Sequence, residues 1–498
     1  MNVFNTKMLD RIISLIEKCY YVLFILILIL ILILILILIL AAFNIFHNLG
    51  NVPIDSWDEA RHGVSAYEMM RRNDYIVNTY TYKNDYWNLK PPISYWAIVL
   101  GYKMVGFNPL GLRIIPAFAA MLTIFIISIY CLYTKGRIAS LVSASVLTTT
   151  IPYITEHCAR TGDADSIYVL FFTIAILCLS LIEKNKKWLY GYGLAFALAF
   201  LTKSWHAGSI AVIGIIYLLF SKLLFKFKIR HIIALILSAS IPIAIWLVLR
   251  YPKDGLEFLK NMIGYDLMAR TSTCLEGHVG GVCYYIEHLQ VLNFYWAVVL
   301  MGILVALVAF LDEYKSNSKL VSCVFTVVLW IAVPFLFYTF AKTKITWYIL
   351  PVFPAMAVAI GVGSDFLLKA KARNIISQIL IITILAVATY KNEALIREKI
   401  LTFNKNPNQE LFKEVGASKD YKGRKIYMQN CVREQNLVLT SELYADLKPS
   451  NDGLEGFLKD NTEKPLLLTT KDEARRLGDK IGKLKLVFES RGVYIFTK

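Results

Sequence analysis

The sequence predicts a helical protein that crosses a membrane many times and carries a small soluble α/β domain at its C-terminal end. Of its 498 residues, 57% are hydrophobic and 18% are charged, whereas about a quarter are charged in soluble domains. Several apolar runs reach the roughly 20 residues that a helix needs to cross a bilayer. After residue 391 these runs give way to short alternating strands and helices, which are typical of a water-soluble domain.

The first predicted span contains an unbroken Ile–Leu run over residues 25–40, preceded by Lys7, Arg11 and Lys18. Alternation indicates a strand only where polar residues occupy the other face. Because both faces are apolar here, a helix is the state that satisfies the backbone in lipid. The run is longer than a signal-peptide core, and no small-residue cleavage site follows it. We expect an uncleaved anchor with a cytoplasmic N-terminus in the inner (plasma) membrane.

Ten further spans are predicted from the apolar runs. They cover residues 111–133, 138–153, 166–182, 189–202, 209–222, 231–250, 291–311, 320–341, 345–366 and 374–390. Lys and Arg gather in every second connecting loop, near residues 135, 186, 226, 317 and 371, which the positive-inside rule places in the cytoplasm. This alternation requires residues 92–107 to form an interfacial or re-entrant helix. We expect about 11 transmembrane helices, with about 13 as the upper bound.

The polar segments then fall on the outer side of the membrane. They are a first outer loop with interfacial helices (51–110), a large outer loop (251–290) and the tail (392–498), whereas residues 1–391 form the membrane core. In the tail, residues 425–429 and 466–470 read as strands, 471–478 as a helix, and 484–488 with 493–497 as a hairpin. Because the tail shows no nucleophile motif, metal spacing or phosphate loop, we expect a scaffold or acceptor-docking domain.

The formal net charge of +17 does not indicate a nucleic-acid partner. The basic residues lie in short clusters between apolar runs and form no basic face with interleaved aromatic residues. Most cysteines lie in or beside apolar runs, where they act as small apolar side chains. Cys274 and Cys283 share the large outer loop. A disulfide between them and two free thiols both remain open.

The first outer loop carries the residues that best suit catalysis. Asp58, Arg61 and His62 are three and four positions apart, so a helix presents them on one face. Asp58 could take a proton from a hydroxyl as a general base. Arg61 and Lys90 could neutralise a departing phosphate. The alternative is an ordinary ion pair on a solvated interfacial helix.

Seven short motifs, in order, give the chain a family resemblance. They are Trp57-Asp58-Glu59-Ala60-Arg61; Asn88-Leu89-Lys90-Pro91-Pro92 with Tyr95-Trp96; Gly111-Leu112-Arg113-Ile114-Ile115-Pro116; Ala159-Arg160-Thr161-Gly162-Asp163-Ala164-Asp165; Gly193-Leu194-Ala195 through Leu201-Thr202-Lys203; His278-Val279-Gly280 with Tyr284-Tyr285; and Lys342-Thr343-Lys344-Ile345-Thr346-Trp347-Tyr348-Ile349-Leu350-Pro351. The chain thereby resembles the integral-membrane glycosyltransferases of the GT-C superfamily, in particular the lipid A aminoarabinose transferases and the protein O-mannosyltransferases.

The resemblance implies a multi-pass GT-C fold and transfer of a sugar from a polyprenyl-phosphate donor to a lipid, glycan or protein acceptor. It implies that Asp58 is the catalytic base of an inverting displacement, supported by Glu59 and Arg61. The second acid maps to Asp165, with Asp163 as a competitor. The donor phosphate would be held by basic and tyrosine side chains, namely Arg61, Lys90, Lys203, Lys342, Lys344 and Tyr348. For Lys342 and Lys344, capping a span end is the alternative role.

A divalent metal, Zn or Mg, is the one cofactor that the resemblance raises. The lipid A group commonly has a glutamate that helps to hold a metal where this chain has Leu89, whereas His278 matches a family histidine. His62 and His157 are the other histidines that could join a metal site. Two other functions are open: a transporter or flippase for lipid-linked sugars, and a non-catalytic binding subunit. A transporter would place its polar residues at mid-bilayer rather than at one surface.

Overall fold

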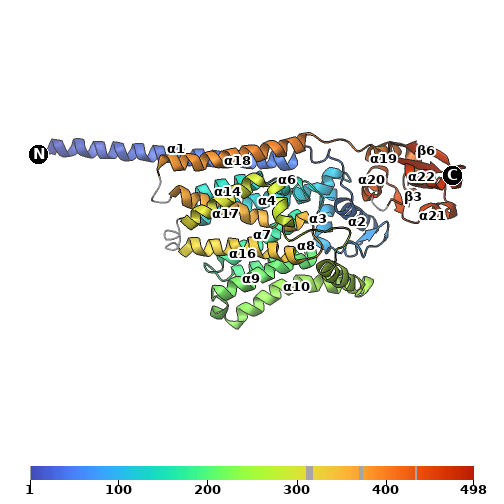
Figure 1. The fold of residues 1–498 in the computed structure, drawn as a ribbon, viewed down its shortest axis with the longest axis horizontal. Coiled ribbons are helices and arrows are strands. Elements are labelled where there is room, and N and C mark those ends of the chain that lie inside the picture. Colours follow the sequence, from blue (N-terminus) through green and yellow to red (C-terminus); the bar gives the residue numbers. More distant parts are fainter. Residues whose placement is uncertain (1, 310–317, 370–373, 432–433) are drawn as a thin grey trace.

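A bundle of long helices joined at one end to a small sheet domain makes up the computed structural model, which describes residues 2–309, 318–369, 374–431 and 434–498 (Figure 1). Helix α1 (Asn2–Phe46) runs beside α18 (Ile375–Leu401) and then continues past the other helices. Asn44 Nδ2 donates to Glu393 Oε2 at 2.8 Å, which joins these two helices near the sheet-domain end.

Each of the eleven predicted spans coincides with a helix. Besides α1 and α18, these helices are α4 (Pro109–Thr134), α5 (Arg137–Thr148), α7 (Asp165–Leu181), α8 (Trp188–Lys203), α9 (Gly208–Phe220), α10 (Ile229–Asp254), α14 (Phe294–Ala309), α16 (Ser318–Phe340) and α17 (Val352–Lys369). Among the described residues, seven segments are long and apolar enough to cross a membrane, and α5, α7 and part of α14 are shorter apolar helices. The multi-pass helical fold is confirmed, and the number of crossings stays a prediction. Parts of the predicted cytoplasmic loops, residues 310–317 and 370–373, lie outside the described residues.

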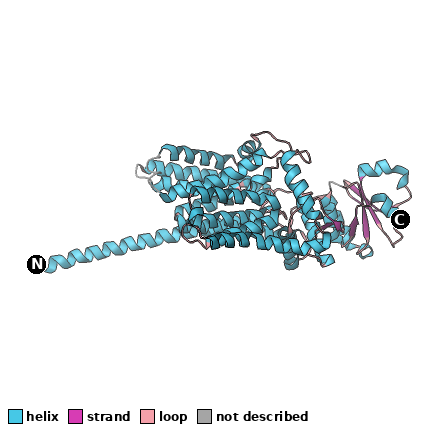
Figure 2. Ribbon diagram, turned by 90° about the horizontal axis from the view of Figure 1, so that it is seen from below, coloured by secondary structure: helices cyan, strands magenta, loops and turns pink. Residues whose placement is uncertain are grey.

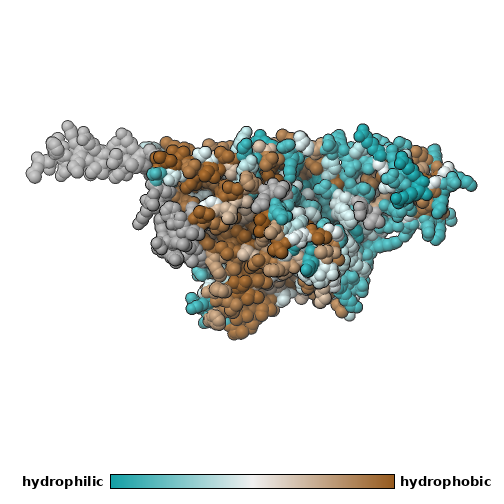
Figure 3. All heavy atoms as spheres, viewed as in Figure 1, coloured by the Kyte–Doolittle hydropathy of each residue, from teal (hydrophilic) through white to brown (hydrophobic). Residues whose placement is uncertain are grey.

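The outer surface of the bundle is apolar, as a lipid-facing surface must be. Figure 3 shows hydrophobic residues covering the bundle, most densely around α9 and α10, and hydrophilic residues covering the sheet domain. On α10, Ile233, Ile236 and Leu237 are exposed. A helix that presents large aliphatic side chains outward is stable only in an apolar solvent.

Short elements close the end of the bundle that faces the sheet domain. They are α2 (Asp58–Arg72), β1 (Thr79–Tyr80), β2 (Lys83–Asn84), α3 (Pro92–Val105), α6 (Ile151–Thr155), η1 (Ser204–Ala207), α11 (Glu257–Asn261), a π-helix η3 (Met262–Ala269), α12 (Arg270–Ser272), α13 (Tyr284–Leu292) and η4 (Thr346–Ile349); η2 (Leu224–Lys226) lies between α9 and α10. Helix α3 is the predicted interfacial segment. Its 14 residues extend about 21 Å, which is shorter than the bilayer core.

The sheet domain has five strands in the order β4-β3-β5-β7-β6 (Figure 2). Its elements are α19 (Pro407–Ala417), η5 (Lys419–Tyr421), β3 (Lys425–Gln429), α20 (Gln435–Ala445), β4 (Lys448–Ser450), α21 (Gly453–Lys459), β5 (Leu466–Thr470), α22 (Lys471–Leu477), η6 (Gly478–Lys480), β6 (Lys485–Glu489) and β7 (Val493–Thr497). Strands β4, β3 and β5 are parallel, and β7 and β6 continue the sheet in antiparallel pairs. The predicted strands, the helix after β5 and the hairpin are confirmed. The predicted domain boundary at residue 392 falls inside α18 and stays a prediction.

The sheet domain packs on the first outer loop through a shared hydrophobic core. In this core Ala60 and Val64 of α2 meet Phe412 of α19 and Leu439 of α20. A Cβ added to Gly63 would lie 2.5 Å from Leu439 Cδ2, so glycine permits α2 and α20 to approach closely. The domain is therefore docked against the loop that follows the first span.

Candidate functional site

A cavity of about 720 Å³ opens at the end of the bundle that faces the sheet domain, beside the start of α2. Its polar lining comes from six separate segments of the chain, which the fold brings together at one end of the bundle. The residues that line it are Asp55, Ser56, Trp57, Asp58, His62, Trp87, Lys90, His157, Asp163, Ala164, Asp165, Lys203, Arg270, Glu276, His278, Ile345, Trp347 and Tyr348. A cavity of this size with convergent charged groups is suited to a small polar substrate.

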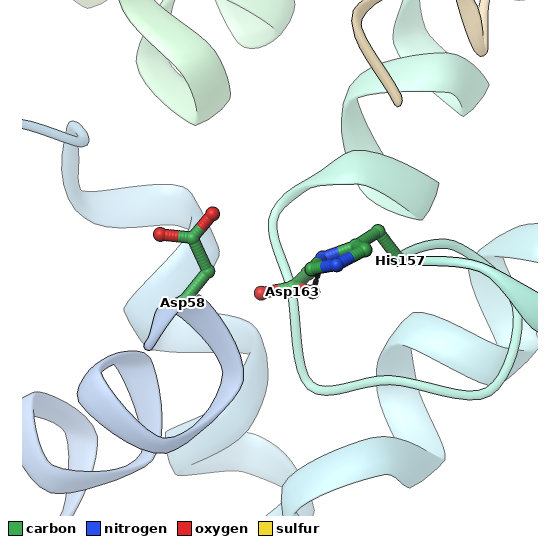
Figure 4. A group of neighbouring side chains, drawn as sticks. All are labelled: Asp58, His157 and Asp163. Carbon is green, nitrogen blue, oxygen red and sulfur yellow. Dashed lines mark hydrogen bonds and ion pairs between the residues drawn. The ribbon is translucent and has the colours of Figure 1, made fainter. Parts of the chain in front are cut away.

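Two aspartates and a histidine face one another on one wall of the cavity (Figure 4). Asp58 begins α2, and His157 and Asp163 lie on the loop between α6 and α7. His157 Nδ1 lies 2.9 Å from Asp163 Oδ2, and the imidazole stacks on Trp347 with ring centroids 3.6 Å apart. Burial alone would lower the pKa of His157, but Asp163 and Asp58 raise it to about 9. At neutral pH His157 is therefore a cation between carboxylates.

Asp58 remains ionised because cations surround it. Burial alone would raise its pKa, but His62, Lys90 and His157 together lower it below the ordinary value. His62 Nδ1 lies 2.6 Å from the Asp58 backbone carbonyl oxygen, so it donates to that oxygen. Its Nε2 is buried and has no hydrogen-bond partner among the described residues. A half-buried carboxylate facing an open cavity is available to accept a proton.

A second cluster, made of Lys90, Lys203 and Arg270, lines the same cavity. Lys203 Nζ forms an ion pair with Asp165. Lys90 Nζ and Arg270 Nε lie 3.8 Å and 3.2 Å from Asp266 Oδ1. Arg270 Nη1 donates to the Tyr348 hydroxyl at 3.4 Å. Three cations and a phenol thus converge, with two carboxylates between them.

Asp266 holds two members of this cluster, Lys90 and Arg270, in place. It lies on η3, its Oδ2 accepts from Ser204 Oγ at 2.6 Å, and it is buried. Burial would raise the pKa of its carboxyl, but Lys90, His206 and Arg270 lower it. Arg270 and Asp266 were not predicted from the sequence. They lie in and directly after a π-helix within a long polar loop, and the sequence gives no sign of that helix.

Seven of the predicted site residues line the cavity: Asp58, Asp163, Asp165, Lys90, Lys203, Tyr348 and His278. The other four predicted residues, Glu59, Arg61, Lys342 and Lys344, are not among the lining residues. Lys342 is exposed on the turn after α16. Lys344 Nζ donates to three backbone carbonyls at the end of α16, those of Tyr338, Thr339 and Ala341. Capping a span end is thus the role that the geometry gives Lys344.

Glu59 and Arg61 brace the loop around the cavity. Glu59 accepts two hydrogen bonds from the buried Arg113, at 2.6 and 2.8 Å, and one from Gly162 N at 2.8 Å. Arg61 makes two hydrogen bonds to Asp85, at 2.8 and 2.9 Å, and lies over the Tyr80 ring. Because both charges are neutralised by a protein partner, neither presents a free charge to the cavity.

The metal site implied by the lipid A resemblance does not fit this chain. Leu89 is 1% exposed and offers only hydrocarbon where that site would need a carboxylate. In the described part of the chain, one group of three side chains could hold a cation: Asp58, His157 and Asp163, with ligand atoms within 4.8 Å of one another. His278 is not in this group. A metal there would have to displace the proton that His157 carries at neutral pH. Cys274 and Cys283 are both free thiols.

Comparisons with known proteins agree with this arrangement. The profile of the dolichyl-phosphate-mannose-protein mannosyltransferase family matches residues 89–246. An uncharacterized protein of Aquifex aeolicus is 27% identical over 407 residues, which are 80% of this chain and 91% of that protein. An undecaprenyl phosphate-alpha-4-amino-4-deoxy-L-arabinose arabinosyl transferase of Pectobacterium carotovorum is 24% identical over 313 residues, 60% of this chain. The chain spans about half the length of that transferase, 53%.

Two solved structures share the fold. ArnT from Cupriavidus metallidurans, bound to undecaprenyl phosphate, has a TM-score of 0.71 at 13% identity, with 94% of this chain and 97% of that chain covered. The archaeal oligosaccharyltransferase AglB from Archaeoglobus fulgidus, in complex with an inhibitory peptide and a dolichol-phosphate, has a TM-score of 0.52 at 9% identity over 84% of this chain and 64% of that chain. The chain thus shares the multi-pass fold of ArnT and is similar in sequence to the dolichyl-phosphate-mannose-protein mannosyltransferase family and to the undecaprenyl phosphate-dependent arabinosyl transferases.

Proposed function

We propose that this protein transfers a sugar from a polyprenyl-phosphate donor to a lipid, glycan or protein acceptor on the outer face of the membrane, by an inverting displacement. One observation carries the proposal: a single cavity holds an ionised aspartate, Asp58, and a separate cluster of cations around Arg270. An incoming hydroxyl needs a base, and a leaving phosphate needs positive charge. The bound undecaprenyl phosphate and dolichol-phosphate of the structural relatives support a donor of this class.

In this mechanism the acceptor hydroxyl lies against Asp58 and the donor phosphate lies against Lys90, Arg270 and Tyr348. The hydroxyl oxygen attacks the anomeric carbon as its proton passes to Asp58. The bond between the anomeric carbon and the phosphate oxygen breaks, and the polyprenyl phosphate leaves with the bonding electrons. The two cations and the Tyr348 hydroxyl stabilise the charge on that phosphate. One attack from the face opposite the leaving group inverts the anomeric configuration.

The remaining ionised groups position the base, Asp58, and the cations that contact the phosphate. Asp163 holds His157 as an imidazolium, and this cation keeps Asp58 in its carboxylate form. Asp165 pairs with Lys203 beside the Tyr348 ring, where the lysine lies 5.5 Å from the ring centroid. The positive-inside pattern of the loops supports an outer location for the cavity and the sheet domain.

The test is sugar transfer by the purified full-length protein in detergent. Mass spectrometry of the co-purified lipid identifies the polyprenyl phosphate, and its labelled sugar ester is then offered with lipid, glycan and peptide acceptors. We expect D58N to lose transfer by about 10²- to 10⁴-fold with unchanged binding of the polyprenyl phosphate. We expect K90M to weaken that binding, because its ammonium would contact the phosphate.

The matched control is K342M, which removes an exposed lysine near the cavity and should change neither quantity. Full transfer by D58N would refute the assignment of the base. If no acceptor received sugar while liposomes containing the protein moved the lipid-linked sugar between leaflets, the transporter alternative would replace the enzyme.

A further inference from the structure

The segment before Asp58 has a backbone conformation that its own sequence does not favour. Residues 54–57 lead into α2, and Asp55, Ser56 and Trp57 line the cavity. Trp57 has φ 63° and ψ −117°, a region that side chains other than glycine rarely occupy. No side chain caps the first turn of α2 at Trp57. Contacts from elsewhere must therefore hold this segment in place.

Two buried glutamines of the sheet domain supply such contacts. Gln435, the first residue of α20, is 1% exposed, and its Oε1 accepts from Trp57 N at 3.1 Å and from Ser56 Oγ at 2.8 Å. Gln409 of α19 accepts from Ile54 N at 3.0 Å and donates to Ile54 O at 2.7 Å. These bonds connect residues more than 350 positions apart, at separations of 378 and 355.

The membrane core holds the same segment from its other side. Glu59, which pairs with Arg113 of α4, accepts from Asp55 N at 2.8 Å. Residues 54–57 are thus clamped between the bundle and the sheet domain, immediately before the aspartate that faces the cavity. Neither Gln409 nor Gln435 lines the cavity, so neither contacts a substrate bound there.

We propose that the sheet domain is a working part of the active site, in which Gln435 positions Asp58 by holding Trp57 in its unfavourable conformation. Gln409 is the second anchor of the same segment. This inference rests on the proposed function, because it assumes that Asp58 acts on the acceptor. It also changes the role predicted for the tail: the domain sets the geometry of the catalytic loop, in addition to any docking of an acceptor.

The decisive comparison is between two substitutions of Gln435. Both donors, Trp57 N–H and Ser56 O–H, point at Oε1, so an acceptor is required at this position. Q435M keeps the side-chain length but removes the acceptor, and we expect kcat to fall at least tenfold with the donor KM within twofold. Q435E keeps an acceptor oxygen but buries an acid, so we expect its fall in kcat to be smaller than that of Q435M. Binding of the polyprenyl phosphate should be unchanged in both variants.

The control is another hydrogen-bonded glutamine of the same domain. Gln429 on β3 accepts from Leu454 N at 2.8 Å and donates to Glu473 at 3.1 Å, within the domain. Q429M should therefore leave kcat within twofold of wild type. Equal falls in kcat for Q429M and Q435M would indicate general loss of the domain structure and would overturn the proposal.

A double variant tests the backbone conformation itself. Glycine occupies positive φ readily, so W57G removes the need to hold position 57. We expect the Q435M substitution to lower kcat by less than threefold in the W57G background. A tenfold loss in both backgrounds would overturn the proposed link between Gln435 and the Trp57 backbone.

The outcomes separate this inference from the proposed function. If the wild type transfers sugar to no acceptor, the proposed function fails; if D58N retains transfer, the assignment of Asp58 as the base fails, and this inference fails with it. If D58N is inactive while Q435M has wild-type kcat, only the positioning role of the domain is refuted. Should Q435M not fold, Q435N replaces it: its amide is one methylene shorter and cannot span the same contacts, so we expect the same fall in kcat. Wild-type kcat in Q435N would contradict the proposal.

Discussion

The two ends of α2 bury carboxyl groups in opposite ways. At its start, Glu59 is fully paired with Arg113, and Asp58 is kept ionised by His62, Lys90 and His157. Near its other end, Glu68 faces Glu442 of α20 in the interface with the sheet domain. Burial raises the pKa of Glu68 to about 7 and that of Glu442 well above its ordinary value. The charge of Glu68 and a hydrogen bond with its side chain raise the pKa of Glu442 further.

The cavity at the start of α2 therefore keeps charged side chains, whereas the interface with the sheet domain near its other end excludes charge. A buried carboxylate costs several kcal/mol unless it is paired, and an unpaired group takes up a proton instead. At the cavity end of α2, nearby cations keep Asp58 ionised. The docking end neutralises its acids by protonation, and it therefore depends on pH. Four experiments test this contrast, in decreasing order of the expected effect.

The largest effect is expected from breaking the buried pair behind the cavity. R113M would leave Glu59 charged, buried and without its cation. We expect the free energy of unfolding to fall by about 3–5 kcal/mol. Thermal unfolding in detergent measures the loss. R475M is the control, because Arg475 pairs with Asp472 and their side chains are 81% and 87% exposed; it should cost about 0.5 kcal/mol or less. Similar stabilities for the two variants would show that the Arg113–Glu59 pair is not structural.

The second effect concerns His157 at alkaline pH. Its folded-state pKa, about 9, lies above its ordinary value of 6.5. Its contribution to stability is therefore complete below about pH 6.5 and is lost as the pH rises through about 9. We expect the free energy of unfolding of the wild type to fall by up to about 3 kcal/mol between pH 7 and pH 10. The loss should be absent in H157F, and an equal loss in that variant would assign it to another group.

The third substitution, unlike the first, should stabilise the protein. Because the pKa of Glu442 is raised on folding, its burial costs little below its unfolded-state pKa, and stability falls as the pH rises through the folded-state pKa. We expect E442Q to stabilise the protein by about 1–2 kcal/mol at pH 8, since it removes an unpaired buried acid. It should have little effect at pH 5.

Thermal unfolding at these two pH values measures the difference. E463Q is the control, because Glu463 is a 71% exposed carboxyl in the same domain. Destabilisation of E442Q at pH 8 would mean that the carboxyl is ionised and paired, which would remove the contrast between the two ends of α2.

The sequence predicts the features of this protein that depend on local forces, namely its helices and strands. Hydropathy predicts the helices because lipid excludes charge along each span, and alternation predicts the strands of the sheet domain. Charges excluded from lipid collect between the spans, which is how Asp58 and Lys90 were predicted, whereas Asp163 and Lys203 were predicted through the family resemblance. Hydropathy does not say which charges pair. Arg61 lies in the predicted loop, but Asp85 neutralises it.

The residues that sequence reasoning missed depend on tertiary contacts. Asp266 lies on a π-helix and Arg270 directly follows it, and no simple periodicity signals such a helix. Gln435 is a neutral side chain in another domain, and nothing near it in the sequence points to Trp57. Chemistry that depends on which segments meet is therefore the part that needs the structure.

The smallest effect is expected at the exposed edge of the same interface. Lys83 of β2 and Asp452 of the sheet domain form an ion pair of 2.8 Å, with side chains 66% and 52% exposed. Solvent and salt screen such a pair, so K83M should change stability by about 0.5 kcal/mol or less. The difference between K83M and wild type should vanish in 1 M salt. A loss of stability above about 1 kcal/mol would mean that surface charge contributes to docking of the sheet domain. We expect the buried contacts of Gln409, Gln435 and Leu439 to supply the docking energy instead.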